Sequence, residues 1–446
     1  MDQVLGLKCT VCGELYGVDE ASYVCPRHGY EGILDVVFDY DLIAQRVDPD
    51  RLAGDARHSI WRYMPLLPVD PQIAQRLVPG TVLSSVGWTP LYPAPRLADH
   101  LGLKHLWVKD DSRQPTASLK DRASAVAVVK AHEGGGDRRH PGDRRHPYDV
   151  VTTASTGNAA AALSGLCAAV NQANVIFVPR TAPEAKIAQL LAYGSTVLLV
   201  DGTYDQAFEL CLEVARTFGW YNRNTGYNPY MSEGKKTVIY EVCEQLSLPG
   251  GKSKGLLTGW RAPDVVFVPV GDGCIIGGVH KGLRDLLTLG WIDHMPRIIG
   301  VQAEGSAPLV DAWERGLDPL EMEPVEAHSV ADSIVAGLPR DRIKALRAVR
   351  ETNGAYIKVS DDQILAAIPA LAQGCGVFAE PAAAAAYAGL VEALDQGIVA
   401  VDERVVVLST GSGLKDISSV MRAVEKQPPV VEPTLAQVKD VLDQGR

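Results

Sequence analysis

The sequence has no apolar run long enough to cross a bilayer and no surplus of basic residues. A membrane-spanning helix needs about 20 consecutive apolar residues, so we expect no membrane partner. Lys and Arg number 43 against 54 Asp and Glu, which gives a formal net charge of −11. Nucleic-acid-binding domains usually have the opposite balance, so we expect no nucleic-acid partner either.

Cysteine is scarce, and the N-terminus lacks the features of a secretion signal. Residues 1–7 contain neither a basic segment nor an apolar stretch of signal length. Eight cysteines in 446 residues do not resemble the disulfide framework of small secreted domains. The sequence therefore predicts a cytoplasmic protein. Its length allows two or three domains, and its 46% hydrophobic content is ordinary for a globular enzyme.

Three of the eight cysteines lie within the first 25 residues. The pattern C-x2-C-x12-C-x2-H runs through Cys9, Cys12, Cys25 and His28. Sulfur and imidazole ligands at this spacing are typical of a zinc ribbon. A ribbon that folds without metal is the alternative interpretation. In either case we expect a structural segment, because four protein ligands leave no coordination position for a substrate.

From about residue 86, short apolar runs rich in β-branched residues alternate with helix-length segments. This alternation predicts an α/β fold with open, doubly wound sheets of parallel strands. In such folds ligands bind beyond the C-terminal ends of the strands, so the residues that follow each strand are the candidates for function. The predicted strands are 106–109, 150–153, 174–178, 196–200, 265–268, 297–301 and 405–408.

One segment interrupts this alternation. Residues 136–141 and 142–147 repeat the sequence Gly-Asp-Arg-Arg-His-Pro. Glycine and proline in each copy exclude a continuous helix, so the segment is predicted to be an exposed basic loop. Phosphate binding is one interpretation of the charge. A duplication tolerated in a surface loop is the interpretation that we favour.

Lys120 stands at a loop-to-helix junction, directly before a helix pattern rich in alanine and valine. The positive end of a helix disfavours the charge of a lysine and attracts anions. That location suits an amine that must be neutral to attack a carbonyl, beside a cofactor that carries a phosphate. A solvated surface lysine is the alternative for this residue taken alone.

Three further loops follow predicted strands. Residues 155–158, Ser-Thr-Gly-Asn, can offer amides and hydroxyls to a carboxylate, although a plain helix cap would look the same. The glycine-rich turn at 271–278 can direct backbone amides at a phosphate. Thr410 follows the last strand, where its hydroxyl can bond a ring nitrogen. Cys274 is interpreted as a small residue at a helix start and is not expected to be a nucleophile.

Lys120 and these loops occur in the order typical of one enzyme family. The chain resembles the threonine synthases, which are pyridoxal-phosphate (PLP) enzymes of the tryptophan synthase β-like fold, or fold type II. The resemblance extends over about residues 86–416. The matching segments are Val86 to Leu91, Pro115 to Arg122, Ser155 to Asn158, Asn228-Pro229, Glu233 to Thr237, Gly271 to Gly278, Glu380-Pro381-Ala382 and Thr410 to Asp416.

The resemblance implies roles for three side chains around the cofactor ring. Lys120 would be the Schiff-base lysine and the proton shuttle. Asn158 would face the phenolic oxygen of PLP, and Thr410 would contact the pyridine nitrogen. A neutral hydroxyl on that nitrogen tends to keep it unprotonated, which suits elimination and replacement at the β or γ carbon better than transamination.

The resemblance also implies two anion sites, a domain division and a homodimer. Ser155, Thr156 and Gly157 would bind the α-carboxylate of a small amino-acid substrate. The cofactor phosphate would lie on Gly271, Asp272, Gly273, Cys274 and Ile275. The division expected is a zinc-ribbon-like segment (1–40), an N-terminal arm (41–85), a large PLP-binding domain (86–150 and 235–425), a small domain (151–234) and a C-terminal tail (426–446).

Position 231 departs from the family pattern. The family segment typically reads N-P-x-R-x-E-G-Q-K-T, and its arginine is expected to bind the phosphate of O-phosphohomoserine. This chain has Met231, which cannot form charge-assisted bonds to phosphate. Lys235, Arg223 or the basic loop would have to supply the missing charge.

Three hypotheses of function follow. The first is threonine synthesis, in which phosphate leaves O-phosphohomoserine and water adds at the β-carbon. The second is a related fold type II elimination or β-replacement on serine, threonine, phosphoserine or an unusual amino acid. The third is a catalytically idle binding protein with a zinc ribbon, which the intact Lys120 and the complete set of loops disfavour.

Overall fold

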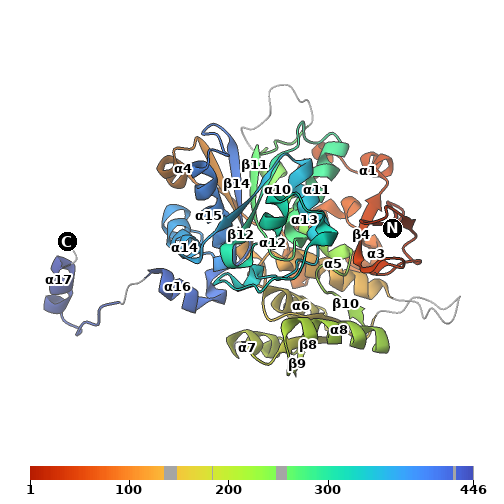
Figure 1. The fold of residues 1–446 in the computed structure, drawn as a ribbon, viewed down its shortest axis with the longest axis horizontal. Helices are drawn as coiled ribbons and strands as arrows, with labels where there is room; N and C mark the ends of the chain where they lie inside the picture. Colours follow the sequence, from red (N-terminus) through yellow and green to blue (C-terminus); the bar gives the residue numbers. More distant parts are fainter. Residues whose placement is uncertain (135–147, 183, 248–258, 425–427, 445–446) are drawn as a thin grey trace.

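The computed structural model describes residues 1–134, 148–182, 184–247, 259–424 and 428–444. Its strands form a six-stranded sheet, a four-stranded parallel sheet and a four-stranded N-terminal sheet (Figure 1). The duplicated basic segment at 136–147 lies outside the described residues. Within the described part of the chain, no helix is long and apolar enough to cross a membrane.

The six-stranded sheet has the order β13-β12-β11-β14-β6-β5. Neighbouring strands are parallel, apart from the short edge strand β5, which runs antiparallel to β6. The predicted strands at 106–109, 265–268, 297–301 and 405–408 are its four central members. The bounds are β5 Leu91–Pro93, β6 His105–Asp110, β11 Val265–Pro269, β12 Arg297–Ala303, β13 Ala355–Val359 and β14 Arg404–Ser409.

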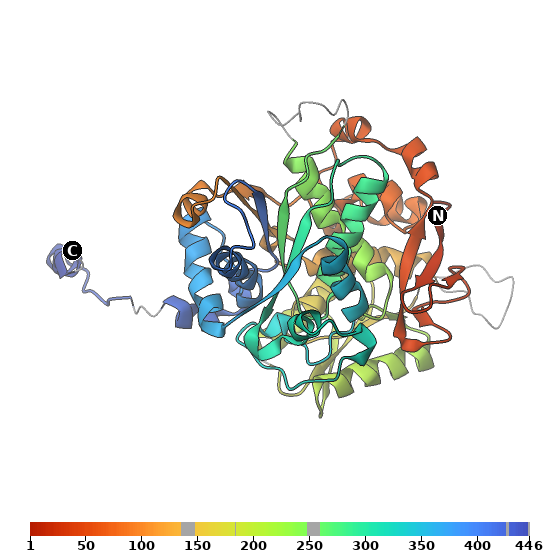
Figure 2. The same ribbon diagram turned by 45° about the horizontal axis from the view of Figure 1, so that its top comes forward.

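Both faces of this sheet are covered, as a doubly wound fold requires. Val266 and Val268 of β11 belong to one apolar cluster, whereas Val265 and Phe267 belong to another. Successive side chains of a strand point to opposite faces, so the two clusters lie on the two sides of the sheet. The first face carries α11 (Cys274–Thr288) and α13 (Arg342–Glu351), and the second carries α4 (Pro95–Leu101), α14 (Asp361–Cys375) and α15 (Pro381–Asp395) (Figure 2).

The four-stranded parallel sheet has the order β10-β7-β8-β9 and lies beside the larger sheet (Figure 1). Val175 and Phe177 of β8 pack under α8, while Ile176 and Val178 face the opposite cluster. The fold is therefore α/β with two doubly wound sheets, as expected. The bounds are β7 Val151–Ala154, β8 Asn174–Pro179, β9 Thr196–Val200, β10 Tyr221–Asn222, α6 Asn158–Ala169, α7 Glu184–Ala192 and α8 Tyr204–Phe218.

The N-terminal sheet is antiparallel and has the order β2-β1-β4-β3. Asp35 on β4 forms an ion pair of 2.9 Å with Lys281 of α11, which anchors this sheet to the body of the protein. The bounds are β1 Val4–Cys9, β2 Leu15–Tyr16, β3 Val24–Cys25 and β4 Gly29–Phe38, followed by α1 Tyr40–Arg46, α2 Pro49–Ala53, η1 Ile60–Leu66, α3 Pro71–Leu77 and η2 Val82–Ser85.

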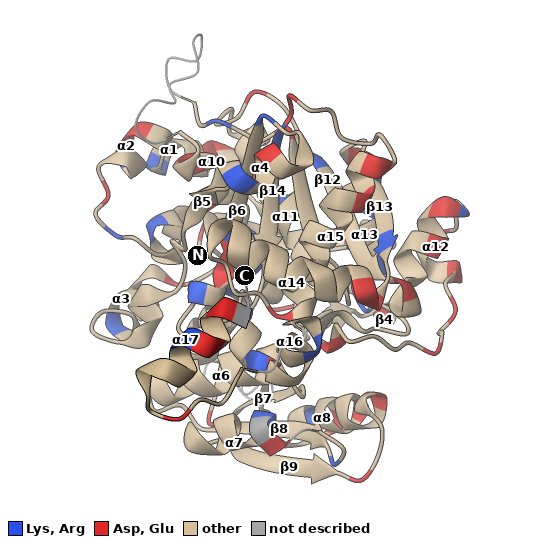
Figure 3. Ribbon diagram, turned by 90° about the vertical axis from the view of Figure 1, so that its left-hand side faces the viewer, with Lys and Arg blue, Asp and Glu red and all other residues tan. Residues whose placement is uncertain are grey.

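Three helices pack together at the centre of the molecule. They are α5 (Lys120–Glu133), α9 (Tyr230–Lys235) and α10 (Thr237–Gln245). By contrast, α17 (Leu435–Gln444) follows α16 (Ile417–Val424) and extends away from the body (Figure 1). Acidic and basic residues are interspersed along the surface helices, as Figure 3 shows for one face. The domain boundaries at 150 and 234 stay a prediction.

Candidate active site

A cavity of about 890 Å³ lies beyond the C-terminal ends of β7 and β11. This is the edge at which open α/β sheets bind their ligands. All of the predicted cofactor and substrate residues except Thr410 line the cavity, although they come from three separate parts of the chain. They are Lys120, Ser155, Thr156, Gly157, Asn158, Gly271, Asp272, Gly273, Cys274 and Ile275.

Lys120 is the first residue of α5 and is partly buried in the cavity wall. Burial, together with the nearby cations Lys235 and Arg223, lowers the pKa of its amine to about 7. Half of such amines are neutral near pH 7, whereas an ordinary lysine is almost wholly charged there. The position therefore suits nucleophilic attack on an aldehyde and the transfer of a proton.

The turn after β11 presents its backbone to the cavity. Gly273 has φ +91°, a conformation that side chains rarely adopt, and it begins α11 without a side-chain cap. A Cβ on Gly271 would stand 2.9 Å from the Cα of Ile334, so only glycine fits there. The first amides of α11 are thus free to bind an anion. Burial raises the pKa of the Cys274 thiol to about 12, which agrees with its not being a nucleophile.

The turn after β7 contains a side-chain contact that the sequence analysis did not anticipate. Asn158 begins α6, and its Nδ2 donates a 2.7 Å hydrogen bond to Oε1 of Glu380. Glu380 is buried, and burial raises the pKa of its carboxyl to about 7, against the lowering effect of the Asn158 bond. Glu380-Pro381 was visible as a family segment, but its sequence distance from Asn158 concealed the pairing.

Thr410 is buried and does not line the cavity. Its carbonyl oxygen accepts a 2.9 Å hydrogen bond from the amide of Leu119, the residue before Lys120. The next residue, Gly411, forms a bridge with Ser118. The end of β14 therefore positions the start of α5, and the contact of the Thr410 hydroxyl with a ring nitrogen stays a prediction.

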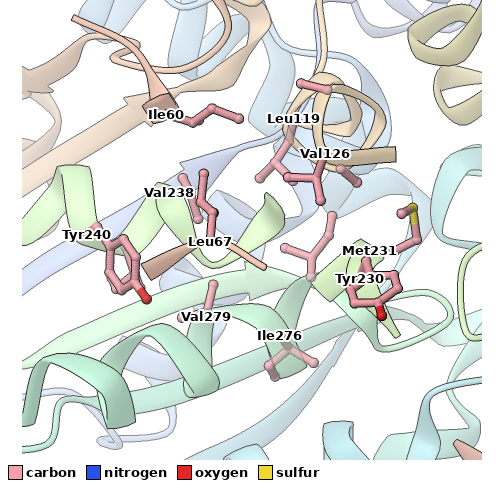
Figure 4. Packing of buried hydrophobic residues seen from close by; sticks show 14 of the residues in the cluster. Ile60, Leu67, Leu119, Val126, Tyr230, Met231, Val238, Tyr240, Ile276 and Val279 are labelled. Carbon is pink, nitrogen blue, oxygen red and sulfur yellow. The ribbon is translucent and has the colours of Figure 1, made fainter. Parts of the chain in front are cut away.

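Met231 packs in the apolar core. Its side chain is fully buried in the cluster that contains Leu119, Val126 and Ile276, and it does not line the cavity (Figure 4). A charged group left unpaired in such an apolar cluster would cost several kcal/mol. The local packing thus explains why methionine, an apolar and adaptable side chain, suits the position.

The segment 324–340 forms a wall of the cavity that the sequence did not reveal. It is joined to the helices of the smaller sheet by two ion pairs, Lys186 with Asp332 and Arg340 with Asp205. The second pair spans 2.7 Å. Because the segment contains only a short 3-10 turn, its sequence has no periodicity that would have identified it.

The four predicted metal ligands come together in the N-terminal sheet. The ligand atoms of Cys9, Cys12, Cys25 and His28 all lie within 4.8 Å of one another. Nδ1 of His28 is 3.4 Å from Sγ of Cys25 and 3.9 Å from Sγ of Cys9. Three thiols and one imidazole at these separations make up the donor set of a structural zinc site.

The fold and the cavity together define a class of enzyme. A family model described as pyridoxal-phosphate dependent enzyme matches residues 82–411, so the chain belongs to this family of PLP-dependent enzymes. The cavity fits the cofactor, since it offers an amine of lowered pKa beside a glycine turn with free amides. These findings identify a PLP-dependent lyase, and the hypothesis of a catalytically idle binding protein is dropped.

Within that family the chain is threonine synthase-like. It is 34% identical to a threonine synthase of Methanocaldococcus jannaschii and 36% identical to one of Methanosarcina acetivorans, each over 98% of both chains. It is 32% identical to a threonine synthase of Mycobacterium leprae, over 81% of this chain and 91% of the relative. The resemblance inferred from the motifs is confirmed.

Solved structures show the same fold. A threonine deaminase from Solanum lycopersicum superimposes with a TM-score of 0.61 at 24% identity, over 80% of this chain and 91% of that chain. A diaminopropionate ammonia lyase from Escherichia coli also has a TM-score of 0.61, at 18% identity, over 80% and 94%. At these identities the match establishes fold type II and leaves the substrate open.

Proposed function

We propose that the enzyme converts O-phosphohomoserine and water to threonine and inorganic phosphate. The γ C–O bond breaks and its electron pair leaves with the phosphate, while water supplies the β-hydroxyl and a proton. The threonine synthase relatives, which cover nearly the full chain, support this proposal. The observation that carries it is the position of Lys120, between the turns after β7 and β11, in a cavity large enough for cofactor and substrate.

The residues around the cavity can each have a separate role in this reaction. When bound, PLP supplies the electron sink for carbanionic charge at the substrate. The amine of Lys120, with its pKa near 7, can take the α-proton and return it at another carbon. The free amides at the start of α6 can orient the α-carboxylate, and those of α11 can hold the cofactor phosphate. Asn158, held by Glu380, would position the ring.

A direct assay tests this proposal. Purified enzyme, loaded with PLP, is given O-phosphohomoserine, and threonine and phosphate are measured together. We expect equal amounts of both products, and we expect Lys120→Ala to lose them. Lys104→Ala, an exposed lysine, is the matched control and should retain the wild-type rate. Wild-type turnover by Lys120→Ala would refute the role of Lys120.

A second candidate function rests on Met231. This chain has no arginine at this position. The alternative substrates are therefore amino acids without a phosphate, such as serine or threonine, and another phosphorylated amino acid, phosphoserine. The same preparation is therefore assayed for release of ammonia and oxo acid from serine, threonine and phosphoserine. Activity on these, with none on O-phosphohomoserine, would establish the alternative.

We also propose that Cys9, Cys12, Cys25 and His28 bind one structural zinc ion. Their clustered ligand atoms support this, and the site is remote in sequence from the residues that line the catalytic cavity. Homodimerisation and a cytoplasmic location stay predictions from the sequence and its resemblance. Metal analysis of the purified protein tests the binding of zinc, and sedimentation tests homodimerisation.

A further inference from the structure

Two adjacent lysines at the end of α9 have opposite surroundings. Lys235 and Lys236 are both fully buried. Nζ of Lys236 lies 2.7 Å from carboxylate oxygens of both Glu233 and Asp285. Nζ of Lys235, by contrast, has no hydrogen-bond or ion-pair partner among the described residues. A buried unpaired ammonium costs several kcal/mol, so its presence calls for an anion that the protein alone does not supply.

Arg223 is a second buried cation, and it has no carboxylate partner among the residues that the structure describes. It follows β10, and its amide donates to the carbonyl of Thr152 on β7, so it is carried by the smaller sheet. Its Nε donates to Ser124 and its Nη1 to Thr225, both neutral hydroxyls, while Nη2 is buried with no partner in the described structure. Burial lowers the pKa of this guanidinium to about 10.

Both cations act on the catalytic cavity. Arg223 lines it, and Lys235 and Arg223 are the two charges that most depress the pKa of Lys120. Burial lowers the pKa of Lys235, while the carboxylates of Asp341 and Asp272 act in the opposite direction, and neither carboxylate forms an ion pair with it among the described residues. The uncapped start of α11 adds a further partial positive charge at the same place.

We propose that Lys235 and Arg223 together bind the phosphate group of a phosphorylated amino-acid substrate. This inference rests on the proposed function and identifies the groups that replace the arginine absent at position 231. A phosphate monoester carries about −1.5 to −2 charges near pH 7, which two cations neutralise. The pair stabilises the phosphate as the C–O bond breaks and its electrons move onto the leaving oxygen.

The substrate phosphate, as opposed to that of the cofactor, is the ligand that we assign. The free amides of the Gly271–Ile275 turn already offer a site for the cofactor phosphate. Arg223 belongs to the same sheet as the Ser155–Gly157 turn, which is the proposed site for the substrate carboxylate. Lys235 on α9 lies against α11, where a Cβ on Gly278 would stand 3.0 Å from its own Cβ, and Arg223 is among the charges that act on it, so we infer that the two cations can share one anion.

Inorganic phosphate, a product of the proposed reaction, serves as the probe. The holoenzyme is titrated with phosphate, and its melting temperature and the inhibition of turnover are recorded. The variants are Lys235→Gln, Lys235→Arg and Arg223→Gln, with Lys104→Gln as a control for total charge. The dissociation constant of PLP is measured separately, from the absorbance of apoprotein titrated with the cofactor.

For Lys235→Gln we expect phosphate affinity to fall about tenfold or more, as loss of a charged hydrogen bond predicts. Lys235→Arg should restore most of it, and the affinity for PLP should change less than about twofold in each variant. Unchanged phosphate affinity together with weakened PLP binding would overturn the assignment, because the cations would then serve the cofactor. A wild-type holoenzyme that does not respond to phosphate would also overturn it.

Melting temperatures separate a binding role from a structural one. Without phosphate, Lys235→Gln should be at least as stable as the wild type, because it removes an unpaired buried charge. Lys236→Gln should be less stable, because it leaves Glu233 and Asp285 without this partner. If phosphate binds through Lys235 but O-phosphohomoserine is not consumed, the inference holds and the proposed function fails.

Discussion

The acidity of Lys120 can be tested without knowledge of the substrate. Its pKa of about 7 arises from burial and from the neighbouring Lys235 and Arg223, while Cys274 and Asp272 act in the opposite direction. The perturbation is a change of pH, applied to the apoprotein and to Lys235→Gln. Because only the neutral amine attacks an aldehyde, the rate of covalent attachment of PLP reports the protonation of Lys120.

The expected effect is large. At pH 7.5 an amine with a pKa of 7 is about three-quarters neutral, whereas one with a pKa of 10.5 is about one part in a thousand neutral. Attachment at this pH should therefore proceed several hundred times faster than at an ordinary lysine of equal intrinsic reactivity. Removal of the Lys235 charge should move the midpoint to higher pH, because that charge depresses the pKa of Lys120.

The assay is stopped-flow absorbance of apoprotein mixed with PLP between pH 5.5 and 9.5. Each rate is divided by that of a lysine peptide under the same conditions, which removes the titration of the cofactor itself. This ratio should be constant below about pH 6.5 and should fall about tenfold per pH unit above about pH 8, because Lys120 is then already neutral while the peptide amine continues to lose protons. A ratio that stays constant through pH 9 would refute a lowered pKa.

The same shift has a consequence for stability. The folded-state pKa of Lys120 lies below its unfolded value of 10.5, so unfolding takes up a proton between pH 10.5 and about 7. The contribution of Lys120 to the stability of the apoprotein is thus present above pH 10.5 and is lost as the pH falls towards 7. The unfolding free energy of the wild type should therefore rise with pH between about 7 and 10.5, and Lys120→Met should lack this rise.

Four further predictions concern other residues. Glu380 has a raised pKa, so its contribution to stability should be lost as the pH rises from 4.5 through about 7, and Glu380→Gln should remove that slope in urea unfolding. Gly273→Ala should weaken PLP retention, measured by dialysis, because φ is +91° and a Cβ would stand 2.8 Å from that of Ala345. Arg122→Met should lower the unfolding free energy by about 3–5 kcal/mol, because it leaves the buried Asp111 without its ion pair and leaves Glu241 with Lys109 alone. Cys9→Ser should reduce bound zinc, measured by mass spectrometry, whereas freshly purified wild type without metal would contradict the proposed site.

Local patterns were sufficient for most strands of the two larger sheets. The predicted strand at 196–200 matches β9 at both ends, and the other predicted strands lie within β6, β8, β11, β12 and β14 or overlap β7. Parallel strands buried on both faces are recognisable because the apolar run is continuous. The edge strand β9 has an equally apolar run, although Leu198 and Leu199 are exposed. The strand β13 was missed, since its sequence Ala-Tyr-Ile-Lys-Val is short and contains the exposed Lys358.

The residues around the cavity were recognisable where a loop follows a strand. Lys120, the Ser155–Asn158 turn and the Gly271–Ile275 turn were predicted on this basis, and the fold brings them together. Glu380 and the 324–340 segment were not predicted as site residues. Their place in the site depends on contacts across more than a hundred residues of sequence, for which a local pattern has no signal.

The sequence by itself determined the α/β class, the cofactor family and the candidate lysine, because strand periodicity and helix-start chemistry are local properties. Only the tertiary structure showed that Met231 faces the core, and that Lys236 is paired while its neighbour Lys235 has no partner in the described part of the chain. The reason is physical: a charge has a function or a structural role according to the groups that surround it after folding. Adjacent lysines with the same local sequence can therefore differ in role.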